Sequence, residues 1–534
     1  MKTLIKNKII IALVATMTLG ACSHFEELNQ DPTTSTNMDP NLMLPTIQMQ
    51  VSGERYETWR NSFIYSSDWM QLWTGEYATV EIGGKGQKNN DYMSAIWDRQ
   101  YSREIRNVVD MIERTAEDPE AQSINAVARI MKAMIFSRLT DLYGDIPYFD
   151  AGKGYFSGVL KPTYDTQEAI YQDLFDQLEL AADALDPAAD AVTQDFYFEG
   201  NIDQWRKFAN SLRLRLAMRL VKVDPAMAQQ EAEAAIAAGV MESNADIPIM
   251  YHNDAPFGGG GQGGNGTSYT LMSSSARESS FRMCRTLAEY LESTGDPRIQ
   301  LMAGSYLDDG TYAGRTDISD QVFAEIGNYS DLSVLPSNFV WQAAGAPIEV
   351  DVDGVATEVS GALQLLQPAR EISRIDAPFI VMSYAEVELW MAEAAFRGWA
   401  AGGTAAEHFA AALAAGVAQY SEYEIELPDQ ATIDAFVAAN PLTVGTELEQ
   451  INTQLWVNFA FNPIEAYSNW RRSGFPAITY PNVDPGVNQS NGEIPRRMQY
   501  PVNEYLLNEE NLSAAAARMS GGDDWTSRIW WDVE

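Results

Sequence analysis

Few residues of this 534-residue chain have the type and spacing that catalysis needs. The chain has three histidines and two cysteines, Cys22 and Cys284, so cysteine–histidine catalysis and histidine-rich metal sites are poorly supplied. Cys284 is predicted to be a small buried apolar residue rather than a nucleophile. Glu386 and Glu393 share one face of a predicted helix, but at 1.5 Å per residue they lie about 10 Å apart along its axis, which is no evidence for a glycosidase pair. Gly-x-Ser-x-Gly and His-Glu-x-x-His motifs are absent, so we expect no catalytic residues, metal or cofactor.

Two arginine pairs, Arg471-Arg472 and Arg496-Arg497, stand out in an acidic chain. Guanidinium groups of this kind can clamp an anionic ligand. Pairing with carboxylates inside the fold is the favoured interpretation, because arginine is rarely buried without a partner.

Two further segments have part of a ligand-loop pattern. Ala255–Gly266 reads APFGGGGQGGNG, but it lacks the Gly-Lys-Ser/Thr ending of a phosphate loop and is predicted to be a flexible surface loop. The run from Glu349 to Gly354 is similar to a calcium loop, yet its twelfth position is Ser360 where a bidentate glutamate is needed. The alternation around Asp353-Gly354 instead predicts a β-hairpin with a tight turn.

The N-terminus carries the pattern of an export signal. Lys2, Lys6 and Lys8 form a basic region, and residues 9–19 form an apolar segment too short to span a bilayer. The small residues Gly20-Ala21 before Cys22 are similar to the lipobox of bacterial lipoproteins. We therefore expect residues 1–21 to be a lipoprotein signal peptide and Cys22 to be acylated, with several acyl chains giving a stable anchor. The alternative is an ordinary signal peptide with a cysteine at its cleavage site.

The formal net charge is −38, and loss of three lysines with the signal leaves −41. This charge excludes a general nucleic-acid binder and opposes adhesion to anionic lipid, so the acyl chains alone would hold the protein on a membrane. The 13 tryptophans and 24 tyrosines exceed the needs of a core, so some are expected to face a ligand.

Apolar residues at helical spacing predict amphipathic helices towards both ends of the chain. The first stripe comprises Val127, Ile130, Met131, Met134, Leu139 and Leu142, and it ends before Gly144 and Pro147. The second comprises Trp205, Phe208, Leu212, Leu216 and Leu220, with Arg206, Arg213, Arg215 and Arg219 off the stripe. The third comprises Tyr384, Val387, Met391, Ala394, Ala395 and Gly398, and is ended by Gly402-Gly403.

These helices are paired across short breaks, which indicates stacked helical hairpins, although no clean 34-residue repeat can be read. Residues 22–41 are polar and without periodicity, typical of a tether, and the folded body is predicted over 42–534. The middle, from about Gly304 to Ser360, is rich in loops, and long connections of this kind usually carry function.

The chain resembles the SusD/RagB family of nutrient-binding outer-membrane lipoproteins, specifically its SusD-like branch. The resemblance covers nearly the whole chain and rests on long, ordered strings. These are FEELNQDPT after the lipobox, Ala126–Ala151, Trp205–Leu220, Ser383–Trp399, Asn462–Pro476, Ile494–Pro501 and Gly521–Asp532.

The resemblance implies a mainly α fold, in which tetratricopeptide-like helical hairpins form a curved scaffold, with loops and small β-hairpins packed on it as a ligand surface. It also implies a partner, a SusC-like TonB-dependent outer-membrane transporter, for which the protein acts as a lid that hands over captured nutrient. Ligands in the family are glycans or peptides, and its work is not catalytic. An exposed outer-membrane location follows.

By position, the resemblance assigns the ligand surface to an early segment and to the mid-chain loops. The corresponding residues are Trp73, Tyr77 and Asn90 in the first region, and Tyr306, Asp308 and Trp341 in the second. The alternative is that Trp73 completes a helical core stripe with Trp69, and that Tyr306 and Trp341 pack beneath loops.

Three classes of function remain distinct. A nutrient-binding lipoprotein, preferably for glycans and alternatively for peptides, agrees with the tether and the aromatic content. A surface glycosidase or peptidase would need a carboxylate pair or a metal site, and neither is visible. A purely adhesive helical solenoid is disfavoured by the long, aromatic-rich loops.

Overall fold

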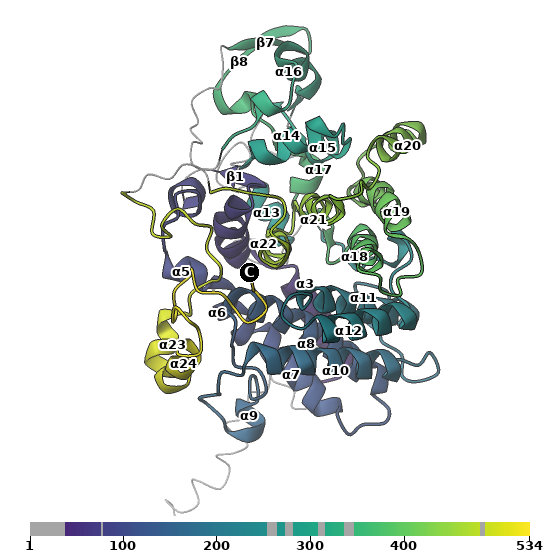
Figure 1. Cartoon of the computed structure of the whole chain (residues 1–534), viewed down its shortest axis with the longest axis vertical. Coiled ribbons are helices and arrows are strands. Elements are labelled where there is room, and N and C mark those ends of the chain that lie inside the picture. Colours follow the sequence, from purple (N-terminus) through teal and green to yellow (C-terminus); the bar gives the residue numbers. More distant parts are fainter. Residues whose placement is uncertain are drawn as a thin grey trace, which may run out of the picture.

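The computed structural model describes residues 38–75, 78–253, 264–272, 281–307, 316–335, 347–480 and 486–534. These ranges are dominated by helices (Figure 1). The helices of the first half are α3 (Leu44–Val51), α4 (Arg55–Glu57), α5 (Asn90–Met93), α6 (Ala95–Ser102), α7 (Glu104–Thr115), α8 (Gln122–Tyr143), α9 (Gly154–Ser157), α10 (Gln167–Ala184), α11 (Ile202–Arg219) and α12 (Pro225–Ala238). Those of the second half are α13 (Gly266–Met272), α14 (Arg285–Ser293), α15 (Arg298–Met302), α16 (Ser319–Ile326), α17 (Arg370–Ser373), α18 (Tyr384–Phe396), α19 (Ala405–Ala418), α20 (Gln430–Ala439), α21 (Glu447–Asn458), α22 (Pro463–Ser473), α23 (Val502–Leu507) and α24 (Glu509–Ala516).

Successive helices pack as antiparallel neighbours and build the scaffold. Helix α8 packs against α7 and α10, and α11 packs against α10 and α12, which gives the layer at the bottom of Figure 1. Helix α18 then packs against α11, α19 and α21, and α22 packs against both α21 and α8. The scaffold therefore curves back on itself, and the mainly α, helical-hairpin architecture expected from the sequence is confirmed.

The strands are short and occur as two-stranded antiparallel pairs. They are β1 (Trp73–Gly75) with β3 (Phe281–Met283), β2 (Ile249–Met250) with β10 (Phe379–Ile380), β4 (Ala303–Gly304) with β9 (Gln367–Pro368), β5 (Tyr306–Leu307) with β6 (Thr316–Asp317), and β7 (Ile348–Val352) with β8 (Val355–Val359). The predicted hairpin is confirmed as β7–β8, where Val352 pairs with Val355 across a turn in which Asp353 and Gly354 have φ of 52° and 83°. These positive angles are those of a type I′ turn, which favours Asp-Gly.

The first predicted helix stripe is confirmed by α8. Its six apolar residues are at most 4% exposed, and Gly144, with φ of 84°, ends the helix where the sequence indicated. The third stripe forms α18, but this helix ends at Phe396 rather than near Gly402-Gly403. Gly398 already adopts a φ of 80° and turns the chain, so the end signal lies earlier than expected.

The second stripe forms α11, and three of the arginines that lie off this stripe are buried. Arg213, Arg215 and Arg219 are not on a solvated face, because they are 5%, 5% and 0% exposed. Helix α11 is enclosed by neighbours on all sides, and these arginines reach carboxylates of other helices. The spacing of apolar residues along a helix cannot predict this burial, because it assigns charged residues to the solvent-exposed face.

Two π-helical segments, Thr58–Ser67 and Thr79–Gly84, lie against each other next to β1. A Cβ added to Gly83 would lie 1.4 Å from the carbonyl oxygen of Ile64, so only glycine allows this backbone approach. The contact fixes the chain on both sides of residues 76–77.

The described chain begins at Met38, with Asp39 capping a short 3-10 helix, Pro40–Leu42. The predicted signal peptide, Cys22 and most of the predicted tether lie outside the described residues. Among the helices of the described ranges, none combines the length and apolarity that crossing a bilayer requires.

Candidate functional site

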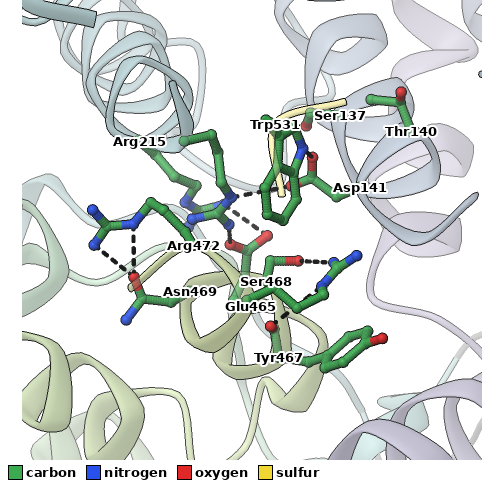
Figure 2. A network of polar contacts seen from close by, with 12 residues as sticks. Ser137, Thr140, Asp141, Arg215, Glu465, Tyr467, Ser468, Asn469, Arg472 and Trp531 are labelled. Carbon is green, nitrogen blue, oxygen red and sulfur yellow. Dashed lines mark hydrogen bonds and ion pairs between the residues drawn. The ribbon is translucent and has the colours of Figure 1, made fainter. Parts of the chain in front are cut away.

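A buried network of ions joins four helices at the centre of the scaffold (Figure 2). Arg215 of α11 donates from Nε and Nη2 to the two carboxylate oxygens of Glu386 on α18, at 2.5 and 2.8 Å. Arg219 of α11 contacts Asp141 of α8 at 3.2 Å and also binds Glu465 of α22. Asp141 further accepts the indole N–H of Trp531 at 2.9 Å, so the C-terminal segment is attached to the same network.

Burial and the neighbouring arginines have opposite effects on the pKa values of the buried carboxylates. Burial raises the pKa of Glu393, but the guanidinium groups of Arg472 and Arg397 outweigh it and lower that pKa to about 2. Burial likewise opposes ionisation of Glu465, and Arg215 and Arg219 bring its pKa below its ordinary value. Burial raises the pKa of Asp141, against the attraction of Arg219.

The network is therefore built to hold helices and lacks a free acid or base. Glu386 and Glu393 are each bound by an arginine through two hydrogen bonds, which agrees with the expectation that they are no glycosidase pair. Buried, paired carboxylates of this kind cannot deliver a proton to a surface substrate.

The arginine pairs behave largely as their favoured interpretation predicted. Arg472 binds Glu393, Arg496 binds Asp532 and Arg497 binds Asp523. Arg471 differs, because its guanidinium lies 4.7 Å from the ring centre of Trp531 and donates to the backbone oxygen of Arg496 at 2.9 Å. Arg471 and Arg496 therefore join the C-terminal segment to α22, whereas Arg472 joins α22 to α18.

The part of the chain that the structure describes also offers few nucleophilic or metal-binding side chains. Cys284 is a buried free thiol whose pKa is raised well above its ordinary value by burial and by the nearby Asp68, as expected for a structural residue. Within the described ranges, no group of three or more His, Cys, Asp or Glu side chains could hold a metal ion.

The two segments predicted to carry the ligand surface meet in space. Strand β1 of the early segment pairs with β3, placing Trp73 opposite Met283. The next residue, Cys284, pairs with Val334. Val80, Val334 and Leu365 also form a small apolar cluster apart from the main core. The described residues that flank 76–77 and 336–346 are thus neighbours.

Trp73 and Tyr306 correspond to their alternative, core interpretation. Trp73 is 0% exposed and its ring stacks on Phe461 at 5.4 Å, so its face is covered. Tyr306 is 4% exposed, and Asp317 lies opposite it across the β5–β6 pair. The placement of these two as exposed stacking platforms is therefore corrected, because both side chains are buried in the described fold.

The remaining four predicted residues stay predictions as ligand contacts, and only Asn90 lies among the described residues. Asn90 is half-buried and links to the C-terminal segment, since its amide donates to the oxygen of Tyr500 at 3.2 Å and accepts from the N–H of Val502 at 2.9 Å. Tyr77, Asp308 and Trp341 lie outside the described residues. The structure brings together the flanks of the two regions, as the argument by position required.

A half-buried aromatic cluster was missed from the sequence. The Arg60 guanidinium lies 3.6 Å from the ring centre of Tyr56 and 5.1 Å from that of Tyr92, and Trp59 lies 6.0 Å from Tyr92. Tyr56 and Arg60 are one helical turn apart, and this i, i+4 spacing is the signal that could have identified the pair. The cluster stacks a cation between aromatic faces, an arrangement that also suits contact with a planar or ring-shaped ligand.

An interior cavity near this region is too small for a sugar ring. It lies between α13, α18 and the start of α22, with Tyr420, Phe379 and Asn462 among its lining residues, and its volume is about 60 Å³. Typical ligand pockets measure roughly 300–1,000 Å³. This cavity therefore has no room for a sugar ring.

The chain belongs to the SusD-like family. The model of that family, described as starch-binding and associating with the outer membrane, matches residues 32–501. No curated protein matches the chain.

Solved structures agree with this assignment. A chitin-binding protein is 37% identical, with 93% of this chain and 100% of that chain covered and a TM-score of 0.79. A SusD-like protein of Bacteroidetes AC2a is 29% identical over 93% of this chain and 100% of its own, with a TM-score of 0.84. A chitin-binding SusD homologue from Flavobacterium johnsoniae, at 22% identity and a TM-score of 0.70, covers 93% of this chain and 99% of its own and supports the fold.

Proposed function

We propose that this protein is a lipid-anchored protein of the outer-membrane surface that captures a glycan and delivers it to a SusC-like TonB-dependent transporter. Cys22 would carry the acyl chains, residues 22–41 would form the tether, and residues 42–534 would form the binding domain. The observation that carries the glycan assignment is the 37% identity to a chitin-binding protein over 93% of this chain.

We take oligosaccharides of β-1,4-linked N-acetylglucosamine as the first ligand class to test, because that relative is named for chitin. The ligand surface would lie over the β1–β3 pair and the neighbouring Val334, where the early and middle segments meet. Tyr77, Asp308 and Trp341 remain its proposed residues. Aromatic rings suit this task because their faces pack on the apolar face of a sugar while nearby polar groups bind hydroxyls.

We propose a binding role and not an enzymatic one. The central carboxylates that could serve as acids or bases are bound by arginines. Incubation with chitin oligosaccharides should therefore leave the ligand intact in a product assay, and release of shorter sugars would contradict a binding role.

The ligand class is tested by calorimetry on the soluble form that begins after Cys22. Chitohexaose should bind with a measurable heat, and maltohexaose and cellohexaose serve as matched controls that differ in linkage or in the acetamido group. Binding of maltohexaose alone would retain the glycan role and reject the chitin class. Binding of a mixed peptide library with no response to any glycan would favour the peptide-binding alternative.

A further inference from the structure

Exposed apolar side chains are concentrated in two short segments. Among the described residues, sixteen large hydrophobic side chains are exposed, and eight of them fall within 149–160 and 502–507. These eight are Phe149, Tyr155, Phe156, Leu160, Val502, Tyr505, Leu506 and Leu507. Tyr155 and Leu160 are 87% and 85% exposed, which is unusual for apolar residues that have no partner.

The two segments lie side by side although about 340 residues separate them. The Tyr164 hydroxyl binds Glu504 at 2.7 Å, and the Asn508 amide donates to the oxygen of Pro162 at 2.8 Å. Figure 1 shows α9 and the α23–α24 pair at the same corner of the molecule. We call the eight exposed residues the apolar corner.

A groove of about 230 Å³ opens beside this corner, between α7 and α10 and over α8. Phe149 belongs both to its lining and to the apolar corner. Three basic and two acidic side chains line the groove: Arg129, Lys132, Lys153, Glu113 and Asp173.

The groove is lined by more basic than acidic side chains. Lys153 lies 3.1 Å from Glu113, and Lys132 lies 3.7 Å from Asp173. Arg129 instead contacts the amide oxygens of Asn125 and Gln177, at 2.7 and 2.5 Å, and forms no ion pair with a carboxylate of the described chain. The groove lining therefore has one more basic than acidic side chain, in a chain of net charge −38.

The groove and corner lie towards the end of the chain that would be anchored. The first described helical turn, Pro40–Leu42, packs on α7. The segment before α9 packs on the same helix, since a Cβ at Gly152 would lie 3.0 Å from the Cβ of Val109. Cys22 is sixteen residues before Met38, a distance of at most about 55 Å in an extended chain. This side of α7 can therefore face the membrane surface.

We propose that the groove and the apolar corner together dock an extracellular segment of the barrel transporter, and that this segment carries an acidic residue beside apolar ones. The inference rests on the proposed function, because that function supplies the barrel. The acidic residue would bind Arg129, and its apolar neighbours would cover Phe149, Tyr155 and Leu160. A second copy of this chain is disfavoured as occupant, because two chains of net charge −38 repel each other. An anionic lipid surface presents many negative charges to the chain and is disfavoured too, whereas the proposed segment presents a single acidic side chain to Arg129.

The position of the surface is tested by photo-crosslinking in intact cells with the full-length protein. A benzophenone amino acid replaces Tyr155, and the control places it at Val444, which is 92% exposed and lies between α20 and α21. Position 155 should crosslink to a β-barrel transporter identified by mass spectrometry, at a peptide that contains Asp or Glu, and position 444 should not. Crosslinks from position 155 only to lipid, only to a second copy, or to nothing while the wild type co-purifies with the barrel would overturn the proposal.

The chemistry is tested by co-purification of the barrel with tagged variants. Tyr155→Ser with Leu160→Ser, and separately Arg129→Glu, should each reduce the recovered barrel at least tenfold, while Val444→Ser recovers it as the wild type does. Each variant is also measured for melting temperature and for glycan binding. Both should stay unchanged, because β1, which flanks the proposed ligand surface, lies in the upper half of Figure 1, away from α9 and the α23–α24 pair. Undiminished recovery with both groove and corner variants would refute the surface.

The two proposals fail in different ways. Absence of glycan binding by the wild type, together with intact barrel recovery, would refute the ligand and leave the docking surface supported. Absence of any barrel with the wild type would refute both the transporter partner and this surface, and glycan binding would stand.

Discussion

Arg472 and Glu393 face each other from α22 and α18, with Nη1 and Nη2 of the arginine donating to the two carboxylate oxygens at 2.7 and 2.8 Å. Both side chains are 1% exposed. Arg397, the residue that follows the end of α18, donates to the same carboxylate at 2.7 Å. The pair ties α18 to α22, two helices that are distant in sequence, and so helps to fix the curvature of the scaffold.

Replacing Arg472 by Ala should destabilise the fold severely. The substitution leaves Glu393 buried without its main partner, and breaking a buried ion pair in this way costs about 3–5 kcal/mol. Urea denaturation at pH 7 measures the loss. Lys85→Ala is the control, because it removes a surface pair with Glu81 and should cost about 0.5 kcal/mol or less. Equal losses in the two variants would contradict the assigned role.

The Glu393 carboxylate should also give the stability a defined pH dependence. Its pKa is lowered from 4.5 to about 2 in the folded protein, so the stabilisation it contributes is complete above pH 4.5 and is lost as the pH falls towards 2. A shift of this size corresponds to about 3 kcal/mol. Denaturation curves from pH 6 to 2 should therefore fall less steeply for Glu393→Gln than for the wild type. Parallel curves would show that another group governs acid unfolding.

The helices were predictable from sequence because their apolar spacing and end signals are local. The α8 stripe and Gly144 are an example, since the residues that form and end this helix lie within one segment. The β7–β8 hairpin was predictable for the same reason, through Asp353-Gly354.

The central network and the fate of Trp73 were not predictable in this way. Arg215 meets Glu386 across 171 residues, and Trp73 is covered by Phe461, so both depend on how distant helices pack. A tryptophan near a loop can be a platform or a core residue, and only its neighbours decide. The argument by position chose two regions whose described flanks, β1 and Val334, are neighbours, but it could not tell that Trp73 is buried.

Trp73→Ala should lower the free energy of unfolding. The side chain is fully buried against Phe461, and removal of a buried aromatic costs about 3–5 kcal/mol. Thermal and urea unfolding measure the effect, with Trp73→Phe expected to recover part of it. A variant that keeps the wild-type melting temperature and loses glycan affinity would instead make Trp73 a ligand contact.

Cys22→Ala should abolish lipid attachment and leave the fold intact, because the described fold begins at Met38. Metabolic labelling with a fatty-acid analogue should mark the wild type alone, and the variant should be released from the outer membrane. The purified variant should melt as the soluble form does. Equal labelling of both proteins would contradict the assignment of Cys22 as the acylated residue.

Trp341→Ala is the sharpest test of the ligand surface. Trp341 lies outside the described residues, seven positions after Val334, which is joined to Cys284 and packs with Val80 beside the early segment; it remains a proposed ligand contact. An exposed stacking aromatic contributes on the order of 1 kcal/mol or more, and the variant should bind chitohexaose about tenfold more weakly in calorimetry. Its melting temperature should change little, in contrast to that of Trp73→Ala, which serves as the matched buried tryptophan. A large loss of stability with affinity intact would place Trp341 in the core and move the ligand surface towards the Tyr56–Tyr92 cluster.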